Sequence, residues 1–217
     1  MLTSKLSPRD HRPTLKLLLG LLLAGCVAPA LAGDPAAGKV KSSVCVGCHG
    51  LDGNSPLPAT PHLAGLAATY VVNQLRSFKD GSRPSPVMAA MAAGLTEEDM
   101  QDIGAWFAGQ RVGGIAPQDD TMRLIEDGRQ LYRSGNAKTG LAACIGCHGK
   151  DGGGLPREPS IPPLRGQKSD YVAQMLTNFK GGMRSNDAEQ MMRRIAERMS
   201  DHEIQAVAAY VERLNKR

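Results

Sequence analysis

The apolar residues of this chain recur at helical spacing in two separate segments, and each segment opens with the same polar signature. A hydroxyl residue is followed three positions later by an acid, in Thr96-x-x-Asp99 and again in Ser200-x-x-Glu203. This arrangement is typical of a capping box, in which two side chains close the N-terminus of a helix. The apolar positions that follow are Met100, Ile103 and Phe107 in the first segment and Ile204, Val207, Val211 and Leu214 in the second. Their spacing predicts two amphipathic helices.

Two further segments predict helices for a similar reason. The run YVVNQLRSFKDGSR begins at Tyr70, and the run YVAQMLTNFKGGMR begins at Tyr171. Each continues for about ten residues before a glycine, Gly81 or Gly181, which is a common helix stop. The connectors between helices are rich in glycine and proline and do not alternate between apolar and polar residues as a strand does. The pattern therefore predicts an all-α fold.

Most of the chain is a tandem repeat. The segment CVGCHGLDG at residues 45–53 returns as CIGCHGKDG at residues 144–152. The offset between the copies is 99 residues at the cysteines, 101 at the two tyrosines and 104 at the capping boxes, so small loop insertions separate them. We therefore expect two helical domains, at residues 33–110 and 123–217, joined by a linker at residues 111–122.

Residues 1–32 are predicted to be a signal peptide rather than part of the fold. Basic residues precede an apolar run from Leu17 to Leu23, and a small-residue segment ends at Ala32. This order is typical of a secretory signal, and the run is too short to anchor the protein across a membrane. A periplasmic protein is therefore expected. The segment LAGC, ending at Cys26, also matches a lipobox, and processing there would tether the protein to a membrane by lipid, although the well-formed site at Ala32 favours removal of Cys26.

Composition and charge add two constraints. Aromatic residues make up only 4% of the chain, and small domains bury little apolar surface, so a further group is expected to complete each core. Residues 33–110 carry five basic and seven acidic side chains, whereas residues 111–217 carry seventeen and thirteen. This division predicts a dipolar molecule that orients against charged partners. The sequence has no basic patch with interleaved aromatic residues, so nucleic acid is not an expected partner.

The repeated cysteines carry the most specific chemical signal, because Cys-x-x-Cys-His is the attachment motif of c-type haem. The two motifs consist of Cys45, Cys48 and His49 and of Cys144, Cys147 and His148. In a helical turn, residues three apart share a face, so both sulfurs reach the vinyl groups along one porphyrin edge and form thioethers. The histidine lies on the same side and reaches the iron as proximal ligand. Two covalently attached haems are therefore predicted.

Three other uses of these cysteines compete with haem. A structural zinc site does not usually place a histidine directly after the second cysteine. Two disulfides would suit an exported protein. A thioredoxin-like redox pair expects a βαβ setting, which the helical pattern does not provide. Two copies of the motif, each followed by histidine, favour haem.

Methionines in register are the predicted sixth ligands. Met88 and Met192 each lie eight residues before a capping residue, within a pattern that both copies share. Met91 and Met191 lie close by but have no methionine counterpart in register, so we expect them to fill gaps in the core. The histidines left outside the signal peptide are His62 and His202. Neither has a histidine counterpart in the other copy, and we expect both to be solvated or structural.

Two prolines and two arginines also recur. Pro61 and Pro162 lie where a backbone carbonyl can accept the proximal imidazole N–H, which would fix the orientation and tautomer of the ring. A rigid turn is a compatible role for both. Arg83 and Arg184 could pair with haem propionates, and solvated arginines at the ends of helices are an equal alternative.

Taken together, these residues resemble the dihaem cytochrome c4 family. The resemblance covers nearly all of residues 33–217 and includes GDPAAGKV ahead of the first motif and the YVVNQL and YVAQML helices. It implies two tandem class I cytochrome c domains related by a pseudo-twofold axis, each enclosing one haem with His/Met ligation. It also implies a periplasmic carrier that passes electrons from the bc1 complex or other donors to terminal oxidases. The extended signal region with LAGC departs from the family pattern.

Axial ligation favours electron transfer over catalysis. A haem with both axial positions filled by protein has no free site for oxygen or peroxide, and Met/His ligation raises the reduction potential. We therefore expect an electron carrier, not an enzyme, that meets its redox partners through transient electrostatic contacts. The alternative is a dihaem enzyme or enzyme subunit, such as a peroxidase or a sulfur-compound dehydrogenase, with one displaceable haem ligand. A third class is a cytochrome subunit bound permanently to a larger complex.

Overall fold

The computed structural model describes residues 33–113 and 122–214. Within these ranges the regular elements are helices, and the only bridge is an isolated one between Asn136 and Leu141. The predicted all-α fold is therefore confirmed. The described residues belong to one compact unit. The predicted signal peptide, including Cys26, lies outside them.

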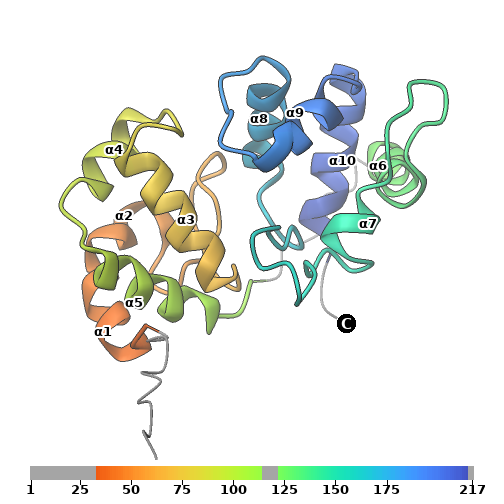
Figure 1. The fold of residues 1–217 in the computed structure, drawn as a ribbon. Coiled ribbons are helices and arrows are strands. Elements are labelled where there is room, and N and C mark those ends of the chain that lie inside the picture. Colours follow the sequence, from red (N-terminus) through yellow and green to blue (C-terminus); the bar gives the residue numbers. More distant parts are fainter. Residues whose placement is uncertain (1–32, 114–121, 215–217) are drawn as a thin grey trace, which may run out of the picture. The chain divides into compact units, whose positions relative to one another are not determined.

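The helices fall into two groups, each packed extensively within itself (Figure 1). We call residues 33–113 domain 1 and residues 122–214 domain 2. Domain 1 contains α1 (Pro35–Lys41), a 3-10 turn (Ser42–Cys45), α2 (Val46–His49), α3 (Ala68–Lys79), α4 (Pro86–Ala92) and α5 (Glu97–Ala108). Domain 2 contains α6 (Met122–Ser134), α7 (Ile145–His148), α8 (Ser169–Lys180), a 3-10 turn (Ala188–Gln190), α9 (Met191–Ala196) and α10 (Asp201–Arg213). The last helix of each domain packs on its first and on its central helix, so the domains share one arrangement.

Both predicted capping boxes are present. In domain 1 the Thr96 hydroxyl accepts the N–H of Asp99 at 3.1 Å, and the Asp99 carboxylate accepts the N–H of Thr96 at 2.8 Å. In domain 2, Ser200 and Glu203 make the same two bonds at 3.2 and 2.7 Å. These bonds satisfy backbone donors that no helical carbonyl can reach, and they set where α5 and α10 begin.

A glycine brings the first and last helices of each domain into backbone contact. A Cβ at Gly38 of α1 would collide with the carbonyl of Asp102 in α5, and a Cβ at Gly128 of α6 would collide with the carbonyl of Ala206 in α10. Only glycine therefore fits either crossing. Neither α1 nor α6 was predicted from sequence, although Asp34 caps α1 through its side chain and Pro35 occupies the first helical position.

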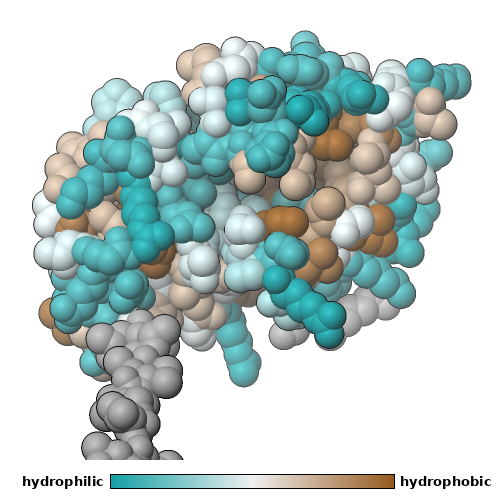
Figure 2. Space-filling model, viewed as in Figure 1, coloured by the Kyte–Doolittle hydropathy of each residue, from teal (hydrophilic) through white to brown (hydrophobic). Residues whose placement is uncertain are grey.

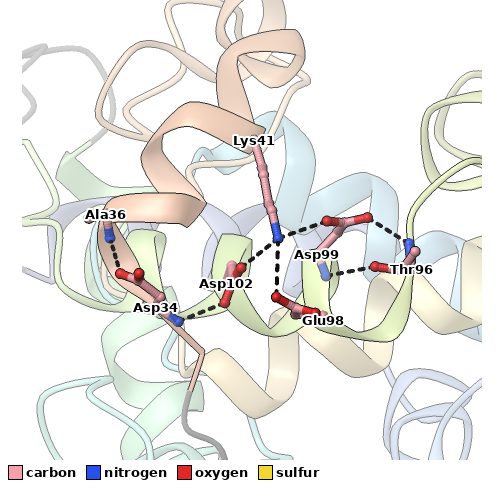
Figure 3. Close-up of polar contacts among 7 residues, drawn as sticks. All are labelled: Asp34, Ala36, Lys41, Thr96, Glu98, Asp99 and Asp102. Atoms are coloured by element: carbon pink, nitrogen blue, oxygen red, sulfur yellow. Dashed lines mark hydrogen bonds and ion pairs between the residues drawn. The ribbon is translucent and has the colours of Figure 1, made fainter.

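In domain 1, ion pairs also join α1 to α5 at this crossing. Figure 3 shows Lys41, at the end of α1, directed at three carboxylates of α5. Its Nζ lies 2.6 Å from Asp102, 2.9 Å from Asp99 and 4.0 Å from Glu98. Asp102 also accepts the N–H of Asp34 at 2.6 Å, and its side chain is only 5% exposed. One buried carboxylate thus connects both ends of α1 to α5.

Each domain has its own apolar core, and aromatic residues are few in both. In domain 1, Phe107 is fully buried beside Ile103 and Met100. In domain 2, the rings of Tyr132 and Tyr210 lie 5.4 Å apart, and the Tyr132 hydroxyl donates to the carbonyl of Gly149 at 2.7 Å. That carbonyl directly follows the second Cys-x-x-Cys-His motif, so α6 is fastened to the motif.

The predicted glycine stops agree with the observed helix ends. Helix α8 ends at Lys180 with Gly181 as its C-cap, and the left-handed residue that follows is Gly182, with φ of +73°. The equivalent stop in domain 1 is Gly81, as expected, with φ of +79°. Helix α6 begins at Met122, the last residue of the predicted linker, and residues 114–121 of that linker lie outside the described ranges.

The two domains contact each other through reciprocal hydrogen bonds. Arg83 of domain 1 donates to the hydroxyl of Tyr171 at 2.9 Å, and Arg184 of domain 2 donates to the hydroxyl of Tyr70 at 3.1 Å. Arg83 and Arg184 occupy equivalent positions, as do the two tyrosines, so exchanging the domains converts one contact into the other. This pairing is what a twofold axis produces.

Candidate haem-binding sites

Each Cys-x-x-Cys-His motif ends in a one-turn helix whose histidine is anchored by the predicted proline carbonyl. Nδ1 of His49 lies 2.9 Å from the oxygen of Pro61, and Nδ1 of His148 lies 2.9 Å from the oxygen of Pro162. A carbonyl can only accept, so Nδ1 carries the hydrogen and Nε2 is the nitrogen available to a metal. Burial lowers the pKa of both histidines, and the bond to the carbonyl opposes part of this effect. Both rings are thus neutral at physiological pH, the form that binds iron.

The four cysteines of the motifs form no disulfide and differ in exposure. Cys45 and Cys144 are half-buried, whereas Cys48 and Cys147 are exposed. Burial raises the pKa of Cys144 to about 11, and burial together with the charge of Cys48 raises the pKa of Cys45. The part of the chain that the structure describes holds no group of three or more histidine, cysteine or acidic residues arranged around a metal ion, so the zinc interpretation finds no ligand set there.

The two predicted ligand methionines are more buried than the methionines near them in sequence. Met88 in α4 is half-buried and packs on the core that Cys45 also contacts, and Met192 in α9 packs on the core that Cys144 contacts. Exposed fractions for the neighbouring residues are 39% for Met91 and 45% for Met191. The gap-filling role expected for these two neighbours is therefore wrong, because both lie at the surface.

The remaining histidines have separate environments. His202 lies at the surface of α10, with Nε2 3.1 Å from the carboxylate of Asp127. His62 is buried, and its Nδ1 accepts the N–H of Ser55 at 2.8 Å. Burial lowers the pKa of His62, as does the nearby charge of Lys168. His202 is thus solvated and His62 is part of a structural hydrogen-bond network.

Arg83 and Arg184 are buried, so the solvated alternative for them is wrong. Arg83 is 7% exposed and Arg184 is 8% exposed. Each guanidinium stacks on an aromatic ring of its own domain: that of Arg83 lies 4.6 Å from the centroid of Phe78, and that of Arg184 lies 4.5 Å from the centroid of Phe179. Both also donate to Oε1 of Gln74, at 2.7 and 3.2 Å. Sequence reasoning missed these partners, and the Gln74 amide that Arg184 meets belongs to the other domain.

Two buried guanidinium groups without an acid are an unusual arrangement. Within the described ranges, neither Arg83 nor Arg184 forms an ion pair. Burial alone would raise the pKa of Tyr70, but the two guanidiniums lower it overall. Burying cations costs free energy unless an anion offsets the charge. A group that carries carboxylates, as haem does, fits this pair.

The surroundings of the motifs also fit a large flat apolar group. In domain 2, Ile145, Leu164, Met192 and Ile195 pack on the core yet stay half-buried. Figure 2 shows hydrophobic side chains gathered over this domain on the face that it presents. Thiols, a neutral imidazole with one bound nitrogen, half-buried apolar side chains and unpaired arginines together match haem. Two such motifs on two equivalent helical domains define a dihaem c-type cytochrome.

Comparisons with known proteins agree with this class. Residues 36–109 match the family model described as cytochrome c, and residues 123–211 match the model described as cytochrome C oxidase, cbb3-type, subunit III. Cytochrome c4 of Pseudomonas aeruginosa is 40% identical over 204 residues, which are 92% of this chain and 99% of that protein. A thiosulfate dehydrogenase electron acceptor of Thiomonas intermedia is 31% identical over 91% of this chain and 90% of that protein.

A solved structure gives the same result. The crystal structure of reduced recombinant cytochrome c4 from Pseudomonas stutzeri matches with a TM-score of 0.78 and 37% identity, over 83% of this chain and 98% of that one. The chain therefore belongs to the cytochrome c4 family. It is an electron-transfer protein with two covalently attached c-type haems. Across residues 33–113 and 122–214, no helix combines the length and apolar character that crossing a bilayer requires.

Proposed function

We propose that each haem iron is held between a histidine and a methionine, His49 with Met88 in domain 1 and His148 with Met192 in domain 2. The observation that carries the proposal is that each histidine is anchored through Nδ1 while a half-buried methionine packs on the core beside the motif. The thioether bonds to the haems would come from Cys45, Cys48, Cys144 and Cys147. When bound, a haem of this kind accepts and releases one electron as its iron changes between ferric and ferrous.

The chain's own residues set the properties of these sites. The carbonyls of Pro61 and Pro162 hold each imidazole in one orientation and one tautomer. Methionine as the sixth ligand raises the reduction potential and fills the position that oxygen or peroxide would need. Arg83 and Arg184 supply buried positive charge for propionates. The resulting sites carry electrons and do no substrate chemistry.

The location and the partners are part of the same proposal. The chain would be exported to the periplasm, residues 1–32 being removed, and would carry electrons from bc1-type donors to terminal oxidases. Encounters would be transient and sensitive to salt, because acidic residues prevail in residues 33–110 and basic ones in residues 111–217. A dehydrogenase is a second candidate donor, since one relative is named a thiosulfate dehydrogenase electron acceptor.

Ligand-binding spectra of the purified dihaem protein test the ligation. Carbon monoxide is added to the ferrous form and cyanide to the ferric form, and the Met–iron charge-transfer band is measured before and after. We expect both haems to resist both ligands, with the band at the strength of two Met-ligated irons. Ready binding at one haem of the native protein would overturn the carrier function in favour of an enzyme with a displaceable ligand.

Stopped-flow reduction distinguishes the donors. The ferric protein is mixed with a reduced bc1-type complex or with a thiosulfate dehydrogenase and thiosulfate, at low and at high salt. The proposal predicts faster reduction by the bc1-type complex, with a rate that falls as salt rises. Faster reduction by the dehydrogenase would make the second candidate the donor.

A further inference from the structure

Gln167 is a domain 2 residue whose buried side chain pairs with the main chain of domain 1. Its Oε1 accepts the N–H of His62 at 2.8 Å, and its Nε2 donates to the carbonyl of His62 at 2.9 Å. Gln167 is 7% exposed. A planar amide that satisfies the donor and the acceptor of one residue fixes both the position and the orientation of that backbone segment.

His62 in turn lies between two groups of the first haem motif. The preceding residue, Pro61, supplies the carbonyl that lies 2.9 Å from Nδ1 of His49. The His62 ring accepts the N–H of Ser55, and the Ser55 hydroxyl donates to the carbonyl of Cys48, both at 2.8 Å. Short hydrogen bonds therefore connect the domain 2 amide to the backbone around the first haem motif.

Among the described residues, no equivalent connection leads toward the second motif. At the matching positions, Leu66 replaces Gln167, Pro163 replaces His62 and Gly154 replaces Ser55. Leucine has no amide, proline has no N–H and glycine has no hydroxyl, so none of the bonds can be repeated. The connection runs one way, from domain 2 to the histidine of domain 1.

We infer that Gln167 is a positioning residue that tunes the potential of the haem in domain 1, acting through His62 and Pro61. A hydrogen bond accepted from Nδ1–H makes a coordinated imidazole more basic, and a more basic ligand favours ferric iron. With Gln167 in place, the Pro61 carbonyl is held at bonding distance from His49. Without it, the carbonyl moves more freely, the bond weakens on average and the potential of this haem rises. The inference rests on the proposed coordination of iron by His49.

The test is Gln167→Met in the full dihaem protein, since methionine keeps the length of the side chain and removes both hydrogen bonds. Each haem is titrated separately by NMR, its signals being assigned through contacts with Cys48 or Cys147. We expect the ferrous-to-ferric ratio of the domain 1 haem to rise about threefold at a fixed applied potential, which is about 30 mV for a one-electron couple. The domain 2 haem should not shift, and the amide of His62 should exchange faster with solvent.

Controls separate tuning from general loosening. Gln174→Met makes the same change at an exposed position of α8 and should shift neither haem. Should Gln167→Met fold poorly, Gln167→Asn withdraws both polar groups by one methylene and allows the same titration. Equal shifts of both haems, or an unshifted domain 1 haem, would overturn the inference. The Met–iron band of the unaltered protein, recorded alongside, shows whether the ligation itself fails, so the two failures are distinguishable.

Discussion

In domain 1 a buried ion pair joins the first and last helices at their crossing, whereas the matching positions of domain 2 hold uncharged side chains. Lys41 and Asp102 pair across α1 and α5 at 2.6 Å. Aligned on the crossing glycines and on the capping boxes, the matching residues of domain 2 are Leu131 and Ala206, which carry no charge. Tyr132 packs against Tyr210 at that crossing instead.

The difference teaches which features of the fold are interchangeable. The glycine at the crossing, the capping box and the proline carbonyl on the histidine occur in both domains. The side chains that surround the crossing do not. Backbone approach and ligand geometry are therefore the shared requirements, and the chemistry that stabilises them varies. Variants can test this by damaging both domains alike or only one.

Loss of a ligand methionine should have the largest effect, and the same effect in each domain. Met88→Ala or Met192→Ala would remove the sixth ligand from one haem and lower its potential by about 0.1 V or more, within the range of about 0.8 V that axial ligands set. The Met–iron band should fall by about half in either variant. Spectroelectrochemical titration of the two haems measures both quantities.

The neighbouring methionines provide matched controls. Met91→Ala and Met191→Ala remove side chains that are 39% and 45% exposed and are not the proposed ligands, so the potentials and the band should stay as in the unaltered protein. If Met91→Ala abolished the band of domain 1 and Met88→Ala did not, the ligand assignment in that domain would be wrong.

The glycine crossings should respond next, again equally. Gly38→Ala and Gly128→Ala place a methyl group against the backbone of Asp102 and Ala206, where no side chain can yield. Overpacking of this kind costs about 1–3 kcal/mol of unfolding free energy. Denaturant unfolding of each variant measures the loss. Gly94→Ala in domain 1, which meets no atom within 4 Å, and Gly181→Ala in domain 2, which meets the carbonyl of Thr177 at 3.5 Å, should cost much less, and an equal cost would show that the crossings are not tight.

How far sequence alone could reach depended on how local each signal was. The capping boxes, the haem motifs and the proline carbonyls depend on residues close together in one copy, and the tandem repeat supplied a second example of each. Helix α1 was missed because it has seven residues and a glycine in its middle, which suggests a break until the partner helix is known. Gly181 and Gly182 are adjacent, and the sequence does not show which of them adopts the left-handed backbone conformation.

The contacts between domains were beyond sequence for a different reason. Arg83 and Tyr171 lie 88 residues apart, and nothing local marks either as buried. An arginine at the end of a helix is usually solvated. From sequence, propionate pairing and solvation are therefore equal alternatives for both arginines, and only the fold shows that both guanidiniums are buried.

Removing either buried arginine should weaken the contact between the domains. Arg83→Leu loses bonds to Tyr171 and Gln74, and Arg184→Leu loses bonds to Tyr70 and Gln74. The lost hydrogen bonds weaken the pairing, but a leucine also removes the cost of burying a cation, so the net destabilisation should be about 1 kcal/mol or less. We expect unfolding to separate into two transitions, followed by calorimetry. A control is Arg129→Leu on the surface of α6, and a single unchanged transition in Arg83→Leu would contradict the reciprocal interface.

The smallest expected effect is on the pH dependence of domain 1. Hydrogen bonds from Lys41 are the largest cause that lowers the pKa of Asp99 and Asp102 below the usual range. Carboxylates with a lowered pKa stabilise the fold above their unfolded value, near pH 4, and this contribution is lost as the pH falls through the folded value. The same bonds raise the pKa of Lys41. Lys41 therefore stabilises the fold at acid and neutral pH, and this stabilisation is lost only when the pH rises above the ordinary pKa of lysine. Acid should therefore loosen α1 before α6.

The double variant Lys41→Leu/Asp102→Ala gives domain 1 the residues of domain 2 and tests this directly. Amide exchange in α1 and α6 is compared at neutral pH and at about pH 3, below the usual pKa of Asp. In the unaltered protein, acid should speed exchange in α1 more than in α6, and in the variant the two helices should respond alike. Lys138→Leu, in the loop after α6, should leave the contrast intact. A contrast that survives in the double variant would mean that charge at the crossing is not what distinguishes the two domains, and that the difference lies in the packing of Tyr132 and Tyr210.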